Sequence, residues 1–385
     1  YREATDEYIG FCGRHDDVNH KCSAVAVKLG DDAGTQARID DWSENGKAAN
    51  YGSLFLFNPL SLKLPRLAIA FKPTCNTDTA KDVAAENKLL GDLFREHISS
   101  QLPIDLTGFS SDGDARRTAN QKKNMTGEVA SADAFSLGHA GFALHGRVTD
   151  GGSITDIEGQ ESKHVTKCTI GALAGKRNLQ LGEYMACFNH VKTAWDEYGS
   201  SAMQMDKAAK DRDDRQNYLA AAMVTCLGAS CHLKKMQKAG WGSGSKPAVE
   251  TQGTDAYLGL VREFQLVHFS ENLTLAQRVE SASYCINLLR FWRNFVHCTP
   301  NLNLGEHFIA RPTYENLTLQ AHSAILLIKA CAKKCPSQKC DALRQTGSDG
   351  NENYFATMVG GRLLPNNKRN ITLQDGIETM ADYNL

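Results

Sequence analysis

The chain has almost no net charge. Its 385 residues include 43 lysines and arginines against 44 aspartates and glutamates, which gives a formal net charge of −1 at pH 7. A dedicated nucleic-acid module carries a strongly basic balance, so the chain as a whole does not belong to that class. Binding to nucleic acid would have to come from local basic clusters, such as Arg116-Arg117 and Lys122-Lys123, or from parts outside this sequence.

Long hydrophobic runs are also missing. No segment approaches the ~20 apolar residues that a membrane-spanning helix needs, and the acidic opening, Tyr1 to Glu7, has no signal-peptide core. We therefore predict no membrane partner and a protein that is not secreted. The composition, 42% hydrophobic and 23% charged, is typical of a globular protein, and the length suits two or three domains. Because the chain begins at Tyr1 rather than Met, we expect a fragment or a processed chain.

The cysteines do not form the pattern of a disulfide framework. Twelve cysteines are spread over the chain, and many lie in apolar, helix-like surroundings where a reduced thiol acts as a small hydrophobe. Free thiols predict a nuclear or cytosolic location. Cys331, Cys335 and Cys340 cluster near the end of an expected helix, where free thiols are the prediction. Structural zinc is the alternative there, but the spacing is irregular and no fourth ligand is identified.

Motifs for nucleotide binding and for nucleophilic hydrolysis are absent. The chain has neither a dinucleotide-binding glycine motif nor a nucleophile elbow. The segment from Gly242 to Pro247 has the wrong glycine spacing for a phosphate loop and indicates a flexible connection instead. A metabolic enzyme built on an α/β domain therefore has little support.

The first third of the chain has the pattern of an α/β fold. Apolar runs predict strands at 23–29, 53–57, 67–71 and 104–109, and apolar residues at helical spacing predict a helix over 82–94. Several strands, a helix and a further strand are typical of a mixed sheet with helices packed on it.

From about residue 164 the pattern changes to helices. Apolar periodicity predicts helices over 181–198, 217–227, 256–268, 275–296 and 317–332. The aromatic stripe within the fourth of these helices is expected to serve core packing rather than base stacking.

Two short acidic segments, far apart in the sequence, carry the candidate chemistry. Asp112 and Asp114 follow the strand expected at 104–109, and Glu352 leads into the apolar segment 354–359. Acidic residues at a strand end and at the start of a distant element can converge on one metal site. Two hard cations held by carboxylates are suited to in-line phosphoryl transfer on nucleic acid. The ordinary interpretation of each Asp-Gly pair is a turn.

An ordered set of motifs along the chain resembles uncharacterised eukaryotic transposon-derived proteins. Those proteins look like distant relatives of P element and hAT transposases. The segments that carry the resemblance are Asn58-Pro59-Leu60, Gly108-Phe109-Ser110-Ser111-Asp112-Gly113-Asp114, Gln160-Glu161-Ser162-Lys163-His164, Asp213-Asp214-Arg215-Gln216-Asn217, 289–295, Gln320-Ala321-His322 and Gly347-Ser348-Asp349 with Glu352.

The resemblance implies an RNase H-like mixed sheet that is interrupted by a large all-helical insertion. The first part of the α/β core would occupy 1–160 and the insertion 161–340. The chain would then return to the catalytic core over 341–385, which carries the late glutamate. Such proteins act as DDE-type nucleases and strand transferases on DNA.

The resemblance also implies three catalytic carboxylates that hold Mg²⁺ or Mn²⁺. Asp112 would be the second acid and Glu352 the third. The first acid would lie on the opening strand, where Glu3 fits the spacing and Asp6 fits the residue type, and the choice stays open. In the assignment with Asp6, the metal ligands are Asp112, Glu352 and Asp6.

Accessory residues are implied beside these acids. His164 with Glu161 matches an acidic-x-x-His pair of the family, although His164 is equally expected as an ordinary polar residue at a helix start. Asp114 is a further accessory acid. The implied partner is DNA at transposon ends, and a homo-oligomer is left open.

The chain departs from the family pattern at several points. Glu161 stands where the family has Asp, and Thr318 stands where it has an acid, with Glu315 one turn away. The first strand is barely present, and no zinc-finger DNA-binding domain precedes it. We therefore expect weak or no catalysis from this chain alone. The alternative is a domesticated, catalytically inactive protein that binds DNA or protein.

Overall fold

The computed structural model describes residues 7–12, 24–28, 51–59, 67–74, 79–102, 104, 106–111, 117, 121, 134–136, 145–148, 154–155, 157–198, 218–238, 251–334 and 343. These residues belong to two compact units. The first contains the strands and the helix that precede residue 104, and the second contains the later strands and the remaining helices. The boundaries predicted at residues 160 and 340 stay predictions.

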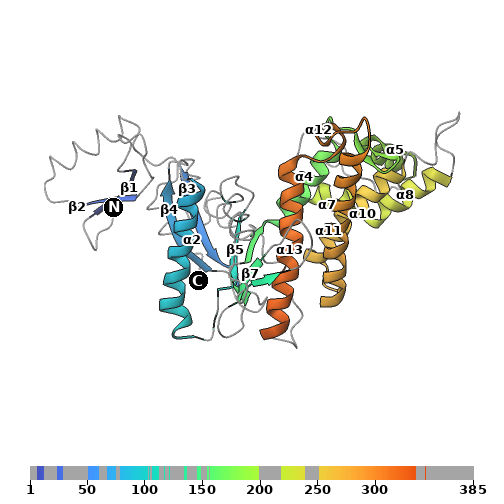
Figure 1. The fold of residues 1–385 in the computed structure, drawn as a ribbon. Helices are drawn as coiled ribbons and strands as arrows, with labels where there is room; N and C mark the ends of the chain where they lie inside the picture. The colour runs from blue at the N-terminus through green and yellow to red at the C-terminus, as the bar shows by residue number, and fades with distance from the viewer. Residues whose placement is uncertain are drawn as a thin grey trace. The chain divides into compact units, whose positions relative to one another are not determined.

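In its described residues, the first unit contains two antiparallel strand pairs and one α-helix (Figure 1). Its elements are β1 (Glu7–Cys12), β2 (Ala24–Lys28), β3 (Tyr51–Phe57), β4 (Leu67–Thr74), α2 (Ala80–Phe94) and a π-helical turn η1 (Arg95–Ser99). The pairs β1–β2 and β3–β4 are both antiparallel. The strands predicted at 53–57 and 67–71 and the helix predicted over 82–94 are confirmed.

The helix α2 begins where its sequence provides a cap. The hydroxyl of Thr79 accepts a hydrogen bond from the N–H of Asp82, and the Asp82 carboxylate accepts one from the N–H of Thr79. This reciprocal arrangement satisfies N–H groups that the first turn of a helix leaves without partners. At the other end of α2, the ring of Phe94 stacks on Phe57 with centroids 5.4 Å apart.

The second unit begins with five short strands. They are β5 (Gly108–Ser111), β6 (Ala134–Ser136), β7 (His145–Val148), β8 (Ile154–Thr155) and β9 (Ile157–Gln160). The pair β5–β9 is parallel, whereas β6, β7 and β8 form an antiparallel three-stranded sheet. The strand predicted at 104–109 thus forms slightly later in the chain. Over the described residues, the fold is a mixed α/β fold with small sheets.

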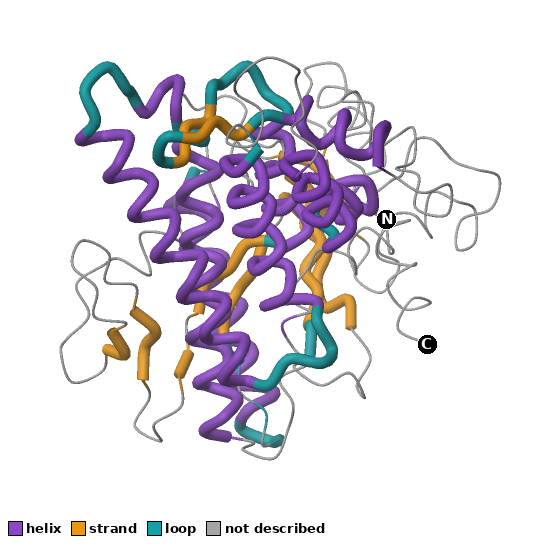
Figure 2. The backbone as a smooth tube through the Cα atoms, turned by 90° about the vertical axis from the view of Figure 1, so that its right-hand side faces the viewer, coloured by secondary structure: helices purple, strands orange, loops and turns teal. Residues whose placement is uncertain are grey.

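Helices make up most of the rest of the second unit (Figure 2). They are α4 (Ser162–Leu173), α5 (Phe188–Tyr198), α7 (Tyr218–Val224), α8 (Leu227–Lys238), α10 (Gln252–Phe269), α11 (Leu275–Cys298), α12 (Leu304–His307) and α13 (Arg311–Lys334). The long helices α10, α11 and α13 pack against one another (Figure 1). The helices predicted over 256–268, 275–296 and 317–332 are confirmed.

The prediction of one helix over 181–198 is wrong for its first residues. They form a hairpin of β10 (Leu179–Leu181) and β11 (Tyr184–Ala186), and the helix starts only at Phe188. Gly182 has a φ of 63° in the connecting turn, a conformation that glycine adopts at no steric cost. Leu179 and Leu181 alternate with an outward-facing residue and are both buried, which is the periodicity of a strand.

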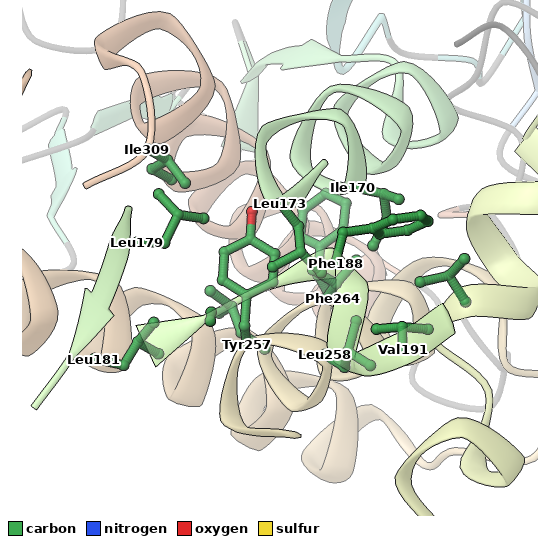
Figure 3. Close-up of a cluster of buried hydrophobic side chains, with 14 of the residues drawn as sticks. Ile170, Leu173, Leu179, Leu181, Phe188, Val191, Tyr257, Leu258, Phe264 and Ile309 are labelled. Carbon is green, nitrogen blue, oxygen red and sulfur yellow. The ribbon is translucent and has the colours of Figure 1, made fainter. Parts of the chain in front are cut away.

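The core of the second unit lies where the hairpin meets α4, α5 and α10 (Figure 3). Tyr257 of α10 is fully buried, and its hydroxyl donates to the carbonyl oxygen of Thr169 in α4 at 2.7 Å. Trp292 of α11 donates its ring N–H to the carbonyl oxygen of Gln180 in the hairpin at 2.6 Å. A buried Trp or Tyr needs such a partner for its polar atom, so each ring also fixes the position of a neighbouring element.

The aromatic stripe of α11 only partly serves the core. Trp292 is 3% exposed and makes an edge contact with Phe308, with ring centroids 4.4 Å apart. The packing role predicted for the stripe is confirmed for this residue. It is wrong for the adjacent Phe291, which is 73% exposed.

Two further expectations concern cysteines and the membrane. Cys285 is a free, buried thiol, and burial raises its pKa, so it acts as the small hydrophobe that the sequence predicts. In the part of the chain that the structure describes, no helix is long and apolar enough to cross a membrane.

Candidate acidic site at the ends of two parallel strands

The parallel pair β5–β9 positions the candidate site. Ser111, the last residue of β5, lies opposite Gln160, the last residue of β9. The N–H of Glu161 donates to the carbonyl oxygen of Ser111 at 2.8 Å, so the ladder continues one step past the end of β9. In the sequence, Asp112 directly follows Ser111. The carboxyl ends of two parallel strands therefore meet at one edge, and an acidic residue comes directly after each strand.

Glu161 lies in the turn between β9 and α4. It is 2% exposed and has the extended backbone of a helix cap, but its side chain makes no capping hydrogen bond. A carboxylate at the N-cap position lies close to the partial positive charge of the helix amino end.

His164 lies in the first turn of α4, three residues after Glu161. Its ring Nε2 is 3.4 Å from the Sγ of Cys168, one turn further along the helix. Burial raises the pKa of the Cys168 thiol, as does the nearby Glu161 charge, while Lys167 acts in the opposite direction. A raised pKa makes this thiol a weaker nucleophile than an ordinary cysteine. The accessory role of the Glu161 and His164 pair stays a prediction.

A cluster of buried amides fills the space beside the strand ends. The side-chain N–H₂ group of Gln121 donates to the carbonyl oxygen of Gly159 at 2.7 Å and to the hydroxyl of Ser111 at 3.3 Å. The side-chain amide of Gln160 donates in turn to the oxygen of Gln121. Both glutamines are almost completely buried. Because buried amides are costly without partners, this network fixes the two strand ends against each other.

The helix α13 contacts the same strand from the helical body. Gln320 accepts a hydrogen bond from the N–H of Gln160 at 2.7 Å and donates one to the hydroxyl of Ser162 at 3.0 Å. Ser323 donates to the carbonyl oxygen of Glu158. A Cβ on residue 159 would lie 3.1 Å from the Gln320 oxygen, so glycine at this position leaves room for the side chain.

Most of the acids predicted from the sequence lie outside the described residues. These are Glu3, Asp6, Asp112, Asp114 and Glu352. Within the described ranges, no group of three His, Cys, Asp or Glu side chains is arranged to hold a metal ion. Of the cysteines considered for zinc, Cys335 and Cys340 also lie outside the described residues.

Among solved structures, the fold is similar to the Drosophila P element transposase strand transfer complex. The TM-score is 0.59 at 12% sequence identity, over 98% of this chain and 75% of that chain. The fold is transposase-like. At this identity the likeness concerns the fold alone, and neither a family model nor a curated protein matches the sequence.

One departure from the family pattern, Thr318, lies among the described residues of α13. Thr318 of α13, at the position where the resemblance expects an acid, is buried, and its hydroxyl has no hydrogen-bond partner in the structure. Glu315, one turn earlier, forms an ion pair with Arg311 at 2.7 Å. His322 is buried, and its Nδ1 lies at hydrogen-bond distance, 2.7 Å, from the carbonyl oxygen of Thr318.

Sequence reasoning missed the polar residues that hold this edge together. Gln121, Glu158, Gln320 and Ser323 are all at most 2% exposed. The signal available in the sequence was a glutamine and a serine within the apolar run of α13, because polar residues on the buried face of a helix need a partner from another element. The partner itself could not be read from the sequence.

Proposed function

We propose that the chain is an RNase H-like, DDE-type transposase relative, distantly similar to P element and hAT transposases. Its reaction would be cleavage and strand transfer at DNA phosphodiesters. The observation that carries the proposal is the parallel pair β5–β9, in which Glu161 is bonded to Ser111, the residue that precedes Asp112 in the sequence. The transposase-like fold over nearly the whole chain adds support.

The residues at this edge fit a hard divalent cation. Carboxylate oxygens are the ligands that Mg²⁺ and Mn²⁺ prefer. Asp112 and Glu352, with Glu3 or Asp6 as the first acid, would hold the ions. Bound ions of this kind activate a water or a DNA 3′-hydroxyl for in-line attack and stabilise the leaving oxygen.

The protein's own part in this reaction is to hold the acids in place. The ladder hydrogen bond from Glu161 to Ser111 and the buried amides of Gln121 and Gln160 set the spacing of the two strand ends. A rigid edge matters because metal-assisted catalysis depends on how closely the ligand positions are defined. DNA would be the substrate, in the nucleus or the cytosol, and self-association of the chain is part of the proposal.

A second candidate function is a domesticated protein that binds DNA or protein without cutting. Two observations favour it. Thr318 offers a buried hydroxyl where the resemblance expects an acid. The chain also carries a formal net charge of only −1, so DNA binding would rest on local phosphate contacts.

The deciding experiment is cleavage of end-labelled duplex DNA with Mg²⁺ or Mn²⁺. Asp112→Asn and Glu352→Gln should each abolish cutting. Asp92→Asn should leave it unchanged, because Asp92 is an exposed carboxylate on α2 that pairs with Lys88 and Arg95. Binding of DNA is measured in parallel by fluorescence anisotropy at low and high salt.

The results distinguish the two proposed functions. Metal-dependent cutting that is lost in both active-site variants supports the nuclease. Salt-sensitive DNA binding without cutting, in either metal, supports the inactive alternative. A chain that neither binds nor cuts DNA overturns both proposals that involve DNA and leaves protein binding.

A further inference from the structure

We propose that Gln320 of α13 is a positioning residue that holds the acidic edge in place from within the helical body. Its two hydrogen bonds reach the last residue of β9 and the first residue of α4, and Glu161 is the single residue between those contacts. The role of Gln320 in catalysis rests on the proposed function, whereas its effect on the turn between β9 and α4 does not.

The geometry of the side-chain amide carries the inference. Its oxygen accepts from the N–H of Gln160 at 2.7 Å, and its N–H₂ group donates to the hydroxyl of Ser162 at 3.0 Å. One planar group thus bridges two points that flank Glu161 on both sides. The side chain is 1% exposed, so water cannot readily replace either bond.

The backbone of Glu161 is bonded on both sides of the turn. Its N–H donates to the carbonyl oxygen of Ser111 in β5, and its own carbonyl oxygen accepts from the N–H of Val165 in α4 at 3.0 Å. Gln320 adds contacts from a third element, α13, to the residues before and after Glu161.

A second contact from the same helix acts in the same direction. Ser323, three residues after Gln320, donates to the carbonyl oxygen of Glu158 in β9. Residues i and i+3 lie on one face of a helix, so Gln320 and Ser323 can both form hydrogen bonds with β9. Gly159 lies between these two contacts, and a Cβ at this residue would lie 3.1 Å from the Gln320 oxygen, which is a tight contact.

Through these contacts, α13 connects the helical body of the second unit to β9. The helix α13 packs against α4, α10 and α11, which belong to the helical body, and against β9. A shift of α13 would move Gln160 and Ser162 with it, and Glu161 between them. The helical body therefore determines the position of Glu161 and, through the bond to Ser111, the end of β5 that precedes Asp112.

The test uses the full chain and a readout that needs no activity. Gln320→Met keeps the approximate shape of the side chain and removes both hydrogen bonds. Gln320→Glu keeps the oxygen that accepts from Gln160. Gln265→Met is the matched control, because Gln265 is a half-buried glutamine of α10 that accepts a hydrogen bond from Thr225, in another part of the body.

Two measurements report on the turn directly. Hydrogen–deuterium exchange of a peptide that spans residues 157–166 should become about tenfold faster in Gln320→Met, since one lost hydrogen bond corresponds to about that factor. Carbodiimide labelling of the Glu161 carboxylate, which is 2% exposed, should rise in the same variant. Gln320→Glu should not restore the protection, because it places a carboxylate at a buried position and removes the donor to Ser162, and Gln265→Met should match the wild type at this turn.

The outcomes separate the inference from the proposed function. Exchange and Glu161 labelling that are unchanged in Gln320→Met overturn the inference, whatever the protein does with DNA. If Gln320→Met does not fold, Ser162→Ala serves in its place because it removes the acceptor of the Gln320 N–H₂ group, and unchanged exchange over 157–166 in that variant overturns the inference equally. A wild-type chain that cuts no DNA defeats the nuclease proposal, and the labelling still decides the role of Gln320. If the wild type does cut, kcat should fall in Gln320→Met with KM little changed, and an unchanged kcat overturns the catalytic part of the inference.

Discussion

The N–H of Glu161 donates to the carbonyl oxygen of Ser111 at 2.8 Å, although the two residues lie far apart in the sequence. This bond extends the parallel pairing of β5 and β9 one residue beyond the end of β9. It places the residue that follows β9 next to the carbonyl that immediately precedes Asp112. The candidate site depends on this pairing, so changes that disrupt the pair should disrupt the site.

Gly108 provides a direct test of the pair. A Cβ at this residue would lie 1.7 Å from the carbonyl oxygen of Ile157, its partner in β9, and no side chain can be accommodated there without moving the backbone. Gly108→Ala should therefore lower the free energy of unfolding by on the order of 3 kcal/mol. Chemical denaturation followed by circular dichroism measures this value.

Gly171→Ala is the control for that substitution. Gly171 lies in α4, and no atom comes within 4 Å of the position that its Cβ would take. Alanine in a helix interior is favoured over glycine, so this variant should be more stable than the wild type by about 0.5–1 kcal/mol. Equal losses in the two variants would contradict the close approach of β5 and β9.

Trp292 and Phe291 are neighbours with opposite environments. Trp292→Ala should cost about 3–5 kcal/mol, because it empties a core site and leaves the Gln180 carbonyl without its donor. Phe291→Ala should change stability by no more than about 0.5 kcal/mol, since the ring is mostly exposed. The midpoint of urea unfolding, compared between these two variants, checks the prediction. A similar loss of stability in both variants would mean that α11 turns a different face to the core than the structure shows.

The start of α11 depends on a capping box. The hydroxyl of Thr274 accepts from the N–H of Gln277, and the Gln277 side chain accepts from the N–H of Thr274. Thr274→Ala should destabilise the protein by about 1 kcal/mol, whereas Thr274→Ser should keep most of the stability. Thermal unfolding of both variants beside the wild type provides the measurement, and a serine variant as unstable as the alanine variant would exclude the cap as the cause.

His268 predicts how stability changes with pH. Burial, with the nearby positive charge of Arg278, lowers its pKa to about 3, and neither ring nitrogen has a hydrogen-bond partner in the structure. The histidine is neutral when folded and binds a proton near pH 6.5 when unfolded. Stability is therefore lost as the pH falls below about 6.5, and the loss continues toward pH 3.

The size of this effect can be isolated with one substitution. Between about pH 7.5 and 5 the histidine should account for about 2 kcal/mol of lost stability, a loss that His268→Leu should remove. His297→Leu, a change at an exposed histidine of α11, serves as the control and should retain the wild-type pH dependence. If His268→Leu shows the same pH dependence as the wild type, the pKa of the histidine does not differ between the folded and the unfolded protein.

Much of the helical body follows from local patterns in the sequence. Apolar spacing predicts α10, α11 and α13, because a helix repeats its buried face every 3.6 residues whatever its partner is. The same rule fails over 181–187, where tertiary packing and the turn at Gly182 favour a hairpin instead. Apolar spacing also cannot predict that Trp292 is buried and Phe291 exposed, because the elements that pack on α11 determine which of its faces is buried.

The candidate site shows the same division. The sequence by itself determined which acids to consider, because Asp112, Glu161 and Glu352 stand in short polar segments beside apolar elements and match the order of a known family. Only the tertiary structure decided that β5 and β9 are parallel neighbours and that Gln320 binds on both sides of Glu161. The physical reason is that a buried amide or a strand edge is satisfied by whichever partner the fold brings within about 3 Å, and no local pattern in the sequence specifies that partner.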